Sequence, residues 1–313
     1  MSKNTQISPR VDIAFKKIFG VEENKDLLIL LINSIVSEEN QVVEVTLLNP
    51  YNAKNFKKDK LSILDIKAKG EDGKRFNIEI QIADEADYHK RALYYWARLY
   101  TEQLQASEGF STLSKAIGIH ILNFTSIPDS SKYHNIFHIV EQDNGLKYFK
   151  DLELHTIELK KFTDSVSNEL TDVIAKLKTS LDIWVAFLTK YHLFDQDTLP
   201  NETKYIGLKK ALHVLEVMNF SEDEREGYDD HHKWLMLQNS AIKKHEQQAR
   251  DEGQAIGEAI GEARGEARGA LKTSIGIVKN MYKLGISIEL IISATNLTRQ
   301  QIEEIIATMG DVT

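Results

Sequence analysis

Two carboxylates, Asp65 and Glu79, stand in nearby segments whose residues alternate between apolar and polar. Both segments, residues 61–69 and 74–82, place their apolar side chains at even positions. The apolar members are Leu64, Ile66, Ala68, Phe76, Ile78, Ile80 and Ile82, and the polar members include Asp65, Lys67, Asn77, Glu79 and Gln81. A period of two predicts two strands that each turn one face towards a core.

The residues between the two segments predict how the strands pair. Residues 71–73 (Glu-Asp-Gly) fit a three-residue hairpin loop in which Gly73 supplies the positive φ. Counting outward from this loop pairs Asp65 with Glu79. A two-residue loop would pair odd with even positions and break the match between faces. We therefore expect both carboxylates on one face of a hairpin, directly opposite each other.

Opposed side chains on paired strands have β-carbons about 5 Å apart, so two carboxylates there repel unless a cation lies between them. Mg²⁺ takes carboxylate and carbonyl oxygens and keeps water ligands for a phosphate substrate. The pattern alone leaves a second interpretation open, in which an exposed hairpin face happens to hold acids.

Four ordered motifs favour the metal site over the second interpretation. An Asp, a turn and then an acid-x-amide resemble the PD-(D/E)xK nuclease core, with Gln81 where most of that superfamily has lysine. The motifs are SPRVDIAFKKIFG (residues 8–20), ILDIKA (63–68), NIEIQ (77–81) and KRALYYW (90–96). Together they resemble the Rpn family of recombination-promoting nucleases, often labelled transposases. The resemblance is dense in the first half of the chain and loose beyond it.

This resemblance implies a metal-dependent DNA endonuclease that hydrolyses phosphodiester bonds, with DNA as its partner and a role in recombination. Asp65, Glu79 and the Ile80 carbonyl would bind Mg²⁺ or another divalent cation, which activates a water and stabilises charge on the phosphate. Lys67 or Gln81 would orient that water. Because Gln81 cannot carry a charge, the usual lysine role passes to Lys67 or to the metal.

Three further residues are auxiliary candidates. Asp12, in the opening motif, would add an acid near the metal, or would interact favourably with the dipole of its own helix. Arg91 and Tyr95 would touch a phosphate or orient Gln81; packing and surface ion pairs explain both residues equally well.

The order of elements predicts an α/β fold: a restriction-endonuclease-like mixed sheet flanked by helices, followed by an all-helical C-terminal region. Helices are expected over residues 11–38 and 88–104, the second with Leu93 and Trp96 on its apolar stripe. Strands are expected over 116–124, 133–141 and 152–159. The predicted regions are a nuclease core (1–160), a helical extension (161–240), a glycine-repeat helix or linker (241–271) and a small module resembling a helix-turn-helix (272–313).

The glycine repeat carries a hypothesis of its own. Gly253, Gly257, Gly261, Gly265 and Gly269 recur every four residues. Each glycine costs about 1 kcal/mol relative to alanine in a helix interior, a loss that close packing of two helices would offset. We therefore expect a homo-oligomer that associates through this helix; a flexible charged linker is the alternative. The module after it carries Glu303 and Glu304 beside Arg299, which favours packing or partner docking over DNA binding.

Composition limits the remaining choices. The formal net charge of -8 argues against general affinity for nucleic acid, so DNA contacts need a local patch. Residues 54–69 offer one, with six lysines against two aspartates. The absence of cysteine excludes disulfides and thiolate chemistry, and no apolar run suggests a membrane span. We expect a cytoplasmic protein without membrane association.

Two other functions remain open, and a histidine metal site is disfavoured. The chain can be a non-catalytic, oligomeric DNA-binding or regulatory protein that keeps the nuclease fold. A transposase that performs strand transfer would also need a module that recognises DNA ends, and none is evident. His120, His134, His138 and His155 stand in strand-like segments without a matched acidic set, which argues against roles as metal ligands.

Overall fold

The computed structural model describes residues 7–51, 65–84, 87–166, 168–195, 199–200 and 202–308. The chain divides into two compact units, Met1–Gln238 and Asn239–Thr313. Each unit is described by itself. Lys54, Lys57, Lys58 and Lys60 of the predicted basic patch lie outside the described residues.

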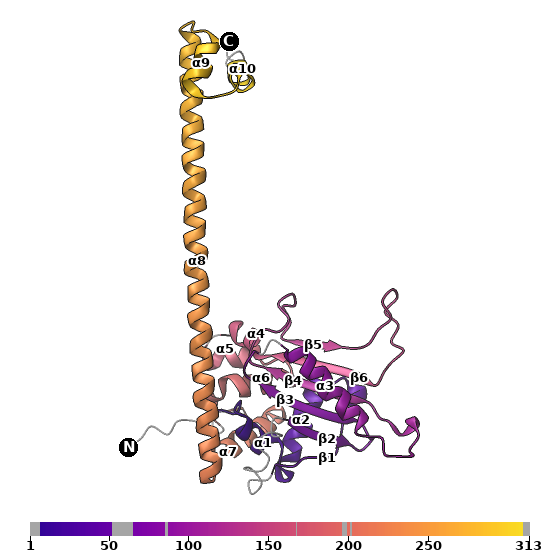
Figure 1. The fold of residues 1–313 in the computed structure, drawn as a ribbon. Helices are drawn as coiled ribbons and strands as arrows, with labels where there is room; N and C mark the ends of the chain where they lie inside the picture. Colours follow the sequence, from indigo (N-terminus) through magenta and orange to yellow (C-terminus); the bar gives the residue numbers. More distant parts are fainter. Residues whose placement is uncertain are drawn as a thin grey trace, which may run out of the picture. The chain divides into compact units, whose positions relative to one another are not determined.

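The first unit is built on one six-stranded mixed sheet (Figure 1). Its strands are β1 (Val45–Leu47), β2 (Asp65–Gly70), β3 (Arg75–Gln81), β4 (Ala116–Leu122), β5 (His134–Phe137) and β6 (Leu152–Glu158). They lie in the order β1-β2-β3-β4-β6-β5. The central strands β3, β4 and β6 are parallel, whereas β1, β2 and β5 pair antiparallel. The predicted α/β fold with a mixed sheet and flanking helices is confirmed.

The hairpin of β2 and β3 has the predicted register. The backbones of Asp65 and Glu79 are directly paired. The loop that joins the strands contains Gly73 at φ 88°, a conformation that favours glycine. Local alternation and loop length therefore determined this pairing correctly.

Helices cover both faces of the sheet. The α-helices of the two units together are α1 (Asp12–Phe19), α2 (Lys25–Ile35), α3 (Tyr88–Thr101), α4 (Leu159–Asp164), α5 (Leu170–Lys176), α6 (Ser180–Lys190), α7 (Ile206–Glu216), α8 (Glu222–Lys283), α9 (Ile288–Thr295) and α10 (Arg299–Ala307), of which α9 and α10 belong to the second unit. The apolar face of the sheet forms the main core with side chains of α1, α2, α6 and α7. On the other face α3 packs against β3 and β4 (Figure 1).

The position of α3 changes two expectations. The polar face of the hairpin is covered, because Asn77 and Glu79 on β3 are both buried. The stripe predicted through Leu93 is wrong in position: Leu93 is exposed, and the buried side chains of α3 are Tyr88, Ala92 and Leu99. These three face β3 and β4, where parallel strands require a helical cover on both sides.

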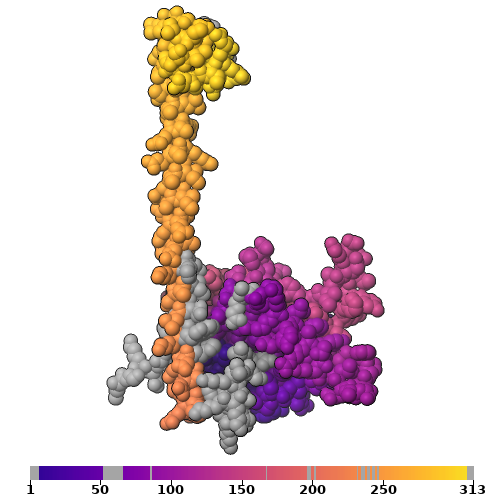
Figure 2. Space-filling view, in the orientation of Figure 1, coloured from indigo at the N-terminus to yellow at the C-terminus, as the bar shows by residue number. Residues whose placement is uncertain are grey.

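The connection from β5 to β6 is an exposed loop. Its residues 139–151 are all exposed, and Figure 2 shows the loop standing out from the rest of the first unit.

Among the helices that the structure describes, none is long and apolar enough to cross a membrane.

The glycine repeat lies within α8, so it is helical. In the second unit the end of α8 packs with α9 and α10 around Val278, Ile291 and Ile302. Thr298 caps α10 through a reciprocal pair of bonds with Gln301. Ser287 stands at the N-cap of α9, but its side chain makes no capping hydrogen bond.

Candidate active site

Glu79 is the central side chain of the candidate site. It lies in the middle of the sheet, is fully buried, and both of its carboxylate oxygens lack a hydrogen-bond donor among the described residues. Its nearest basic neighbours are His120 Nδ1 at 3.6 Å and Arg91 Nη2 at 3.9 Å. A buried carboxylate is normally hydrogen-bonded, so two carboxylate oxygens without a donor indicate a site that binds a ligand.

The donor set around Glu79 fits a hard divalent cation. Two carboxylate oxygens of Glu79 are available as ligands, and the Asp65 backbone is paired directly opposite. The side chain of Asp65 lies outside what the structure describes. The side chain of Ile80 points into the apolar core, so only its carbonyl can serve a metal. Among the described side chains, no three His, Asp or Glu residues converge as metal ligands.

Gln81 and Arg91 lie together next to Glu79. Arg91 Nη2 donates a hydrogen bond of 2.5 Å to Gln81 Oε1, and Gln81 Nε2 donates to the Ala83 carbonyl at 3.0 Å. The guanidinium of Arg91 also lies 5.0 Å from the ring centroid of Tyr88. Arg91 therefore orients Gln81, one of the two contacts that its sequence position suggested.

The described contacts of Lys67 and Tyr95 are with residues other than Glu79 and Gln81. The Lys67 ammonium forms an ion pair of 3.2 Å with Glu102 at the end of α3. Tyr95 is half-buried, and its described ring contact is with Tyr94 at 5.7 Å. Lys67 and Gln81, the two candidates for orienting water, thus have their own partners on or near α3.

Asp12 joins the site electrostatically. Burial raises the pKa of Asp12 to about 7; the charge of Glu79 adds to this rise, and the charges of Lys16 and Arg91 oppose it. Arg10, two residues earlier, donates a 2.8 Å hydrogen bond to Asn123 just beyond the end of β4. This bond holds the start of α1 against the sheet, where Asp12 can interact with Glu79.

The structure adds residues that spacing along the chain did not identify. His120 on β4 and Thr156 on β6 continue the row that Asp65 and Glu79 begin across the sheet. His120 was recognisable as a polar side chain inside a strand of isoleucines. Only the parallel pairing of β3, β4 and β6 places it beside Glu79.

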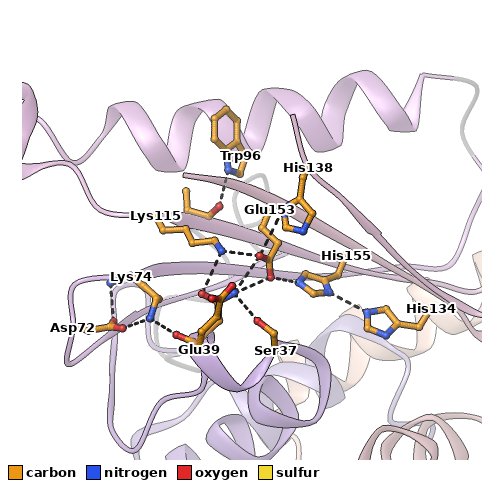
Figure 3. A network of polar contacts seen from close by, with 12 residues as sticks. Ser37, Glu39, Asp72, Lys74, Trp96, Lys115, His134, His138, Glu153 and His155 are labelled. Carbon is orange, nitrogen blue, oxygen red and sulfur yellow. Dashed lines mark hydrogen bonds and ion pairs between the residues drawn. The ribbon is translucent and has the colours of Figure 1, made fainter. Parts of the chain in front are cut away.

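The other strand histidines belong to a separate network on the opposite face (Figure 3). His134 Nε2 lies 2.9 Å from His155 Nδ1, and His155 Nε2 lies 2.8 Å from Glu153 Oε1. Lys115 Nζ donates a 2.7 Å hydrogen bond to Glu153 Oε2. These partners satisfy one another, so the network supports β5 and β6 rather than forming part of the candidate site.

Comparison with known proteins agrees with this geometry. A sequence model of the family described as PD-(D/E)XK nuclease family transposase matches residues 9–245, about three quarters of the chain. No curated protein and no solved structure matches the chain. The matched span contains the whole mixed sheet and the Asp-turn-Glu-x-Gln hairpin, as the sequence motifs predicted. The chain belongs to the PD-(D/E)XK nuclease family transposases.

Proposed function

We propose that this protein is a metal-dependent DNA endonuclease whose active site lies on the β2–β3 hairpin beneath α3. The observation that carries the proposal is the buried Glu79 carboxylate, whose oxygens receive no hydrogen bond from the part of the chain that the structure describes. A charge held this way is costly unless a cation neutralises it.

Asp65, Glu79 and the Ile80 carbonyl would hold Mg²⁺ or another divalent cation. When bound, that cation supplies an activated water and offsets the negative charge that develops on the phosphate. Asp12 lies within electrostatic reach of Glu79 and would add a further carboxylate to the site.

The protein's own groups would align the reactants. Arg91 places a permanent positive charge 3.9 Å from Glu79 Oε1, where it can contact a phosphate oxygen. Gln81, fixed by Arg91, can orient a water through its amide but cannot take up a proton. Lys67 can approach the water only if its ion pair with Glu102 opens.

The proposal is tested by incubating an end-labelled DNA duplex with wild type, Glu79→Gln and Glu44→Gln, each in Mg²⁺ and in EDTA. Glu44 is an exposed carboxylate in the same unit and serves as the control. We expect cleavage by wild type and Glu44→Gln in Mg²⁺ only, and a loss of at least about 100-fold in Glu79→Gln. Cleavage by Glu79→Gln at the wild-type rate would contradict the assignment.

A non-catalytic DNA-binding protein is the second candidate. It is favoured by Gln81, which cannot replace a charged lysine, and by the ion pair that holds Lys67 on Glu102. This function predicts DNA binding that is unaffected by EDTA and a wild-type protein that cleaves no duplex in any divalent cation.

We also propose that the protein self-associates through the glycine repeat of α8. A β-carbon added at Gly253, Gly257, Gly261, Gly265 or Gly269 would meet nothing within 4 Å in the single chain. All residues from 247 to 273 are exposed. A smooth, uncovered helix surface permits the close approach of a second copy, which would offset the low helix propensity of glycine.

A further inference from the structure

We propose that His120 is a positioning residue of this site: it orients the Glu79 carboxylate for the metal and links it to α3. This inference rests on the proposed nuclease function. His120 would not ligate the metal itself but would act through Glu79.

The strand register brings His120 to this place. Glu79 on β3 pairs with His120 on β4, and His120 pairs with Thr156 on β6. Paired residues of neighbouring strands point to the same face, so all three side chains face α3. His120 is fully buried, at 1% exposure.

One nitrogen of His120 faces both Glu79 and α3. His120 Nδ1 lies 2.8 Å from Tyr88 Oη in a hydrogen bond and 3.6 Å from Glu79 Oε2. Tyr88 in turn lies beneath the guanidinium of Arg91, which bonds to Gln81. His120 therefore connects Glu79 with the residue of α3 that orients Gln81.

The other nitrogen of His120 is closely enclosed. Nε2 is buried and has no hydrogen-bond partner among the described residues. A β-carbon at Gly118 would lie 3.0 Å from Nε2 and 2.7 Å from Leu154 Cδ2, so a larger residue there would press on the ring and on Leu154. The absence of a side chain at Gly118 therefore leaves space for the imidazole beside Glu79.

Asn77 shows that the polarity of this layer is general. Its side-chain amide is buried two residues before Glu79 on the same face of β3, and neither its nitrogen nor its oxygen has a partner in the described chain. Buried polar atoms without partners are rare in a layer that serves packing alone, so their presence around His120 favours a role in ligand binding. Groups that orient a metal ligand typically contribute about 10- to 100-fold to metal affinity or activity.

The test compares His120→Asn with His120→Gln and His120→Leu. An asparagine amide reaches the position of Nδ1, a glutamine amide reaches that of Nε2, and leucine keeps the volume without polarity. His155→Asn is the matched control, because His155 is an equally buried histidine on the adjacent strand, facing the other side of the sheet. Mn²⁺ affinity is measured by titration calorimetry, and the Mg²⁺ concentration for half-maximal cleavage is measured in parallel.

We expect His120→Asn to stay within about 3-fold of wild type, while His120→Gln and His120→Leu lose about 10- to 100-fold in metal affinity. His155→Asn should lower thermal stability and leave metal affinity unchanged. If His120→Leu does not fold, the comparison of the Asn and Gln variants decides.

Equal metal affinity in wild type, His120→Asn and His120→Gln would overturn the positioning role and leave the nuclease proposal intact. A wild-type protein that neither binds Mn²⁺ nor cleaves DNA would overturn both proposals.

Discussion

At the scale of single residues, the site combines groups that are unfavourable for folding. Glu79 buries a carboxylate whose oxygens have no donor among the described residues, and burial raises the pKa of Asp12 to about 7. Arg91 Nη2 lies 3.9 Å from Glu79 and His120 Nδ1 lies 3.6 Å from it, too far for either to donate a normal hydrogen bond. Such an arrangement lowers stability in the absence of a cation, and in the proposed function a bound metal would offset that cost.

Replacing Glu79 with Gln should therefore stabilise the metal-free protein. Leaving a buried polar group unsatisfied costs about 1–3 kcal/mol, and a charged group costs more, so we expect a gain of about 1–3 kcal/mol in the free energy of unfolding in EDTA. Saturating Mg²⁺ should stabilise wild type by about 2–3 kcal/mol and leave Glu79→Gln unchanged. Urea unfolding of both proteins and of Glu44→Gln measures this; a Glu79→Gln variant that is less stable in EDTA would contradict it.

Unlike Glu79, Glu153 stabilises the fold, because its carboxylate is paired with Lys115 and His155. Burial alone would raise its pKa, but hydrogen bonds and charges from His155 and Lys115 lower the pKa of Glu153 to about 2. In the unfolded chain the Glu153 carboxylate is protonated near pH 4.5, whereas in the folded chain it stays ionised down to about pH 2. The contribution of Glu153 to the free energy of unfolding is therefore present above pH 4.5 and is lost as the pH falls towards 2.

Glu153→Gln should accordingly lower the free energy of unfolding at pH 7 by about 3 kcal/mol and flatten its decline between pH 4.5 and 2. Unfolding curves at a series of pH values provide the measurement. An unchanged acid slope would show that Glu153 does not carry this dependence.

Some site residues were predictable from the sequence and others were not, for a physical reason. The pairing of Asp65 with Glu79 follows from alternation and loop length, which act over a few residues, and Gln81 was identified through the resemblance to the nuclease core. His120 and Tyr88 join the site through parallel strand pairing and the docking of α3. Those contacts depend on the whole sheet, and no local spacing records them.

Among the elements, α3 determines which side chains surround the polar face of the hairpin. It covers that face, supplies Tyr88 and Arg91, and binds Lys67 through Glu102. Its position was not predictable because its aromatic residues give it more than one apolar stripe. Leu93 was a reasonable core residue by spacing, yet the helix packs through Ala92 and Leu99.

The glycine repeat allows a test in which two effects have opposite signs. Gly261→Ala together with Gly265→Ala should strengthen the isolated helix by about 1 kcal/mol per site, because no atom lies within 4 Å of the added β-carbons. If two copies pack along this stripe, the new methyl groups separate them, and self-association should weaken. Light scattering and circular dichroism measure the two effects.

Gln254→Ala, an exposed change beside the stripe, is the control and should leave the mass unchanged. Unchanged or tighter association of the double variant would show that the glycines do not form the contact.

At the scale of the whole molecule, the family match spans the first unit and the start of the second. The order of strands and helices along the chain was largely predictable, because each strand has an apolar run and each connection has turn residues. β1 was not predicted, since its three residues gain their pairing only from the edge of β2. The net charge of -8 still requires that any DNA contact be local.

The most direct test of the central claim is nicking of supercoiled plasmid by wild type and Asp65→Ala, each in Mg²⁺ and in EDTA. The proposed function predicts relaxed or linear plasmid only with wild type in Mg²⁺. Supercoiled plasmid that survives wild type in Mg²⁺, Mn²⁺ and other divalent cations, or nicking by Asp65→Ala at the wild-type rate, would contradict a metal-dependent nuclease site on this hairpin.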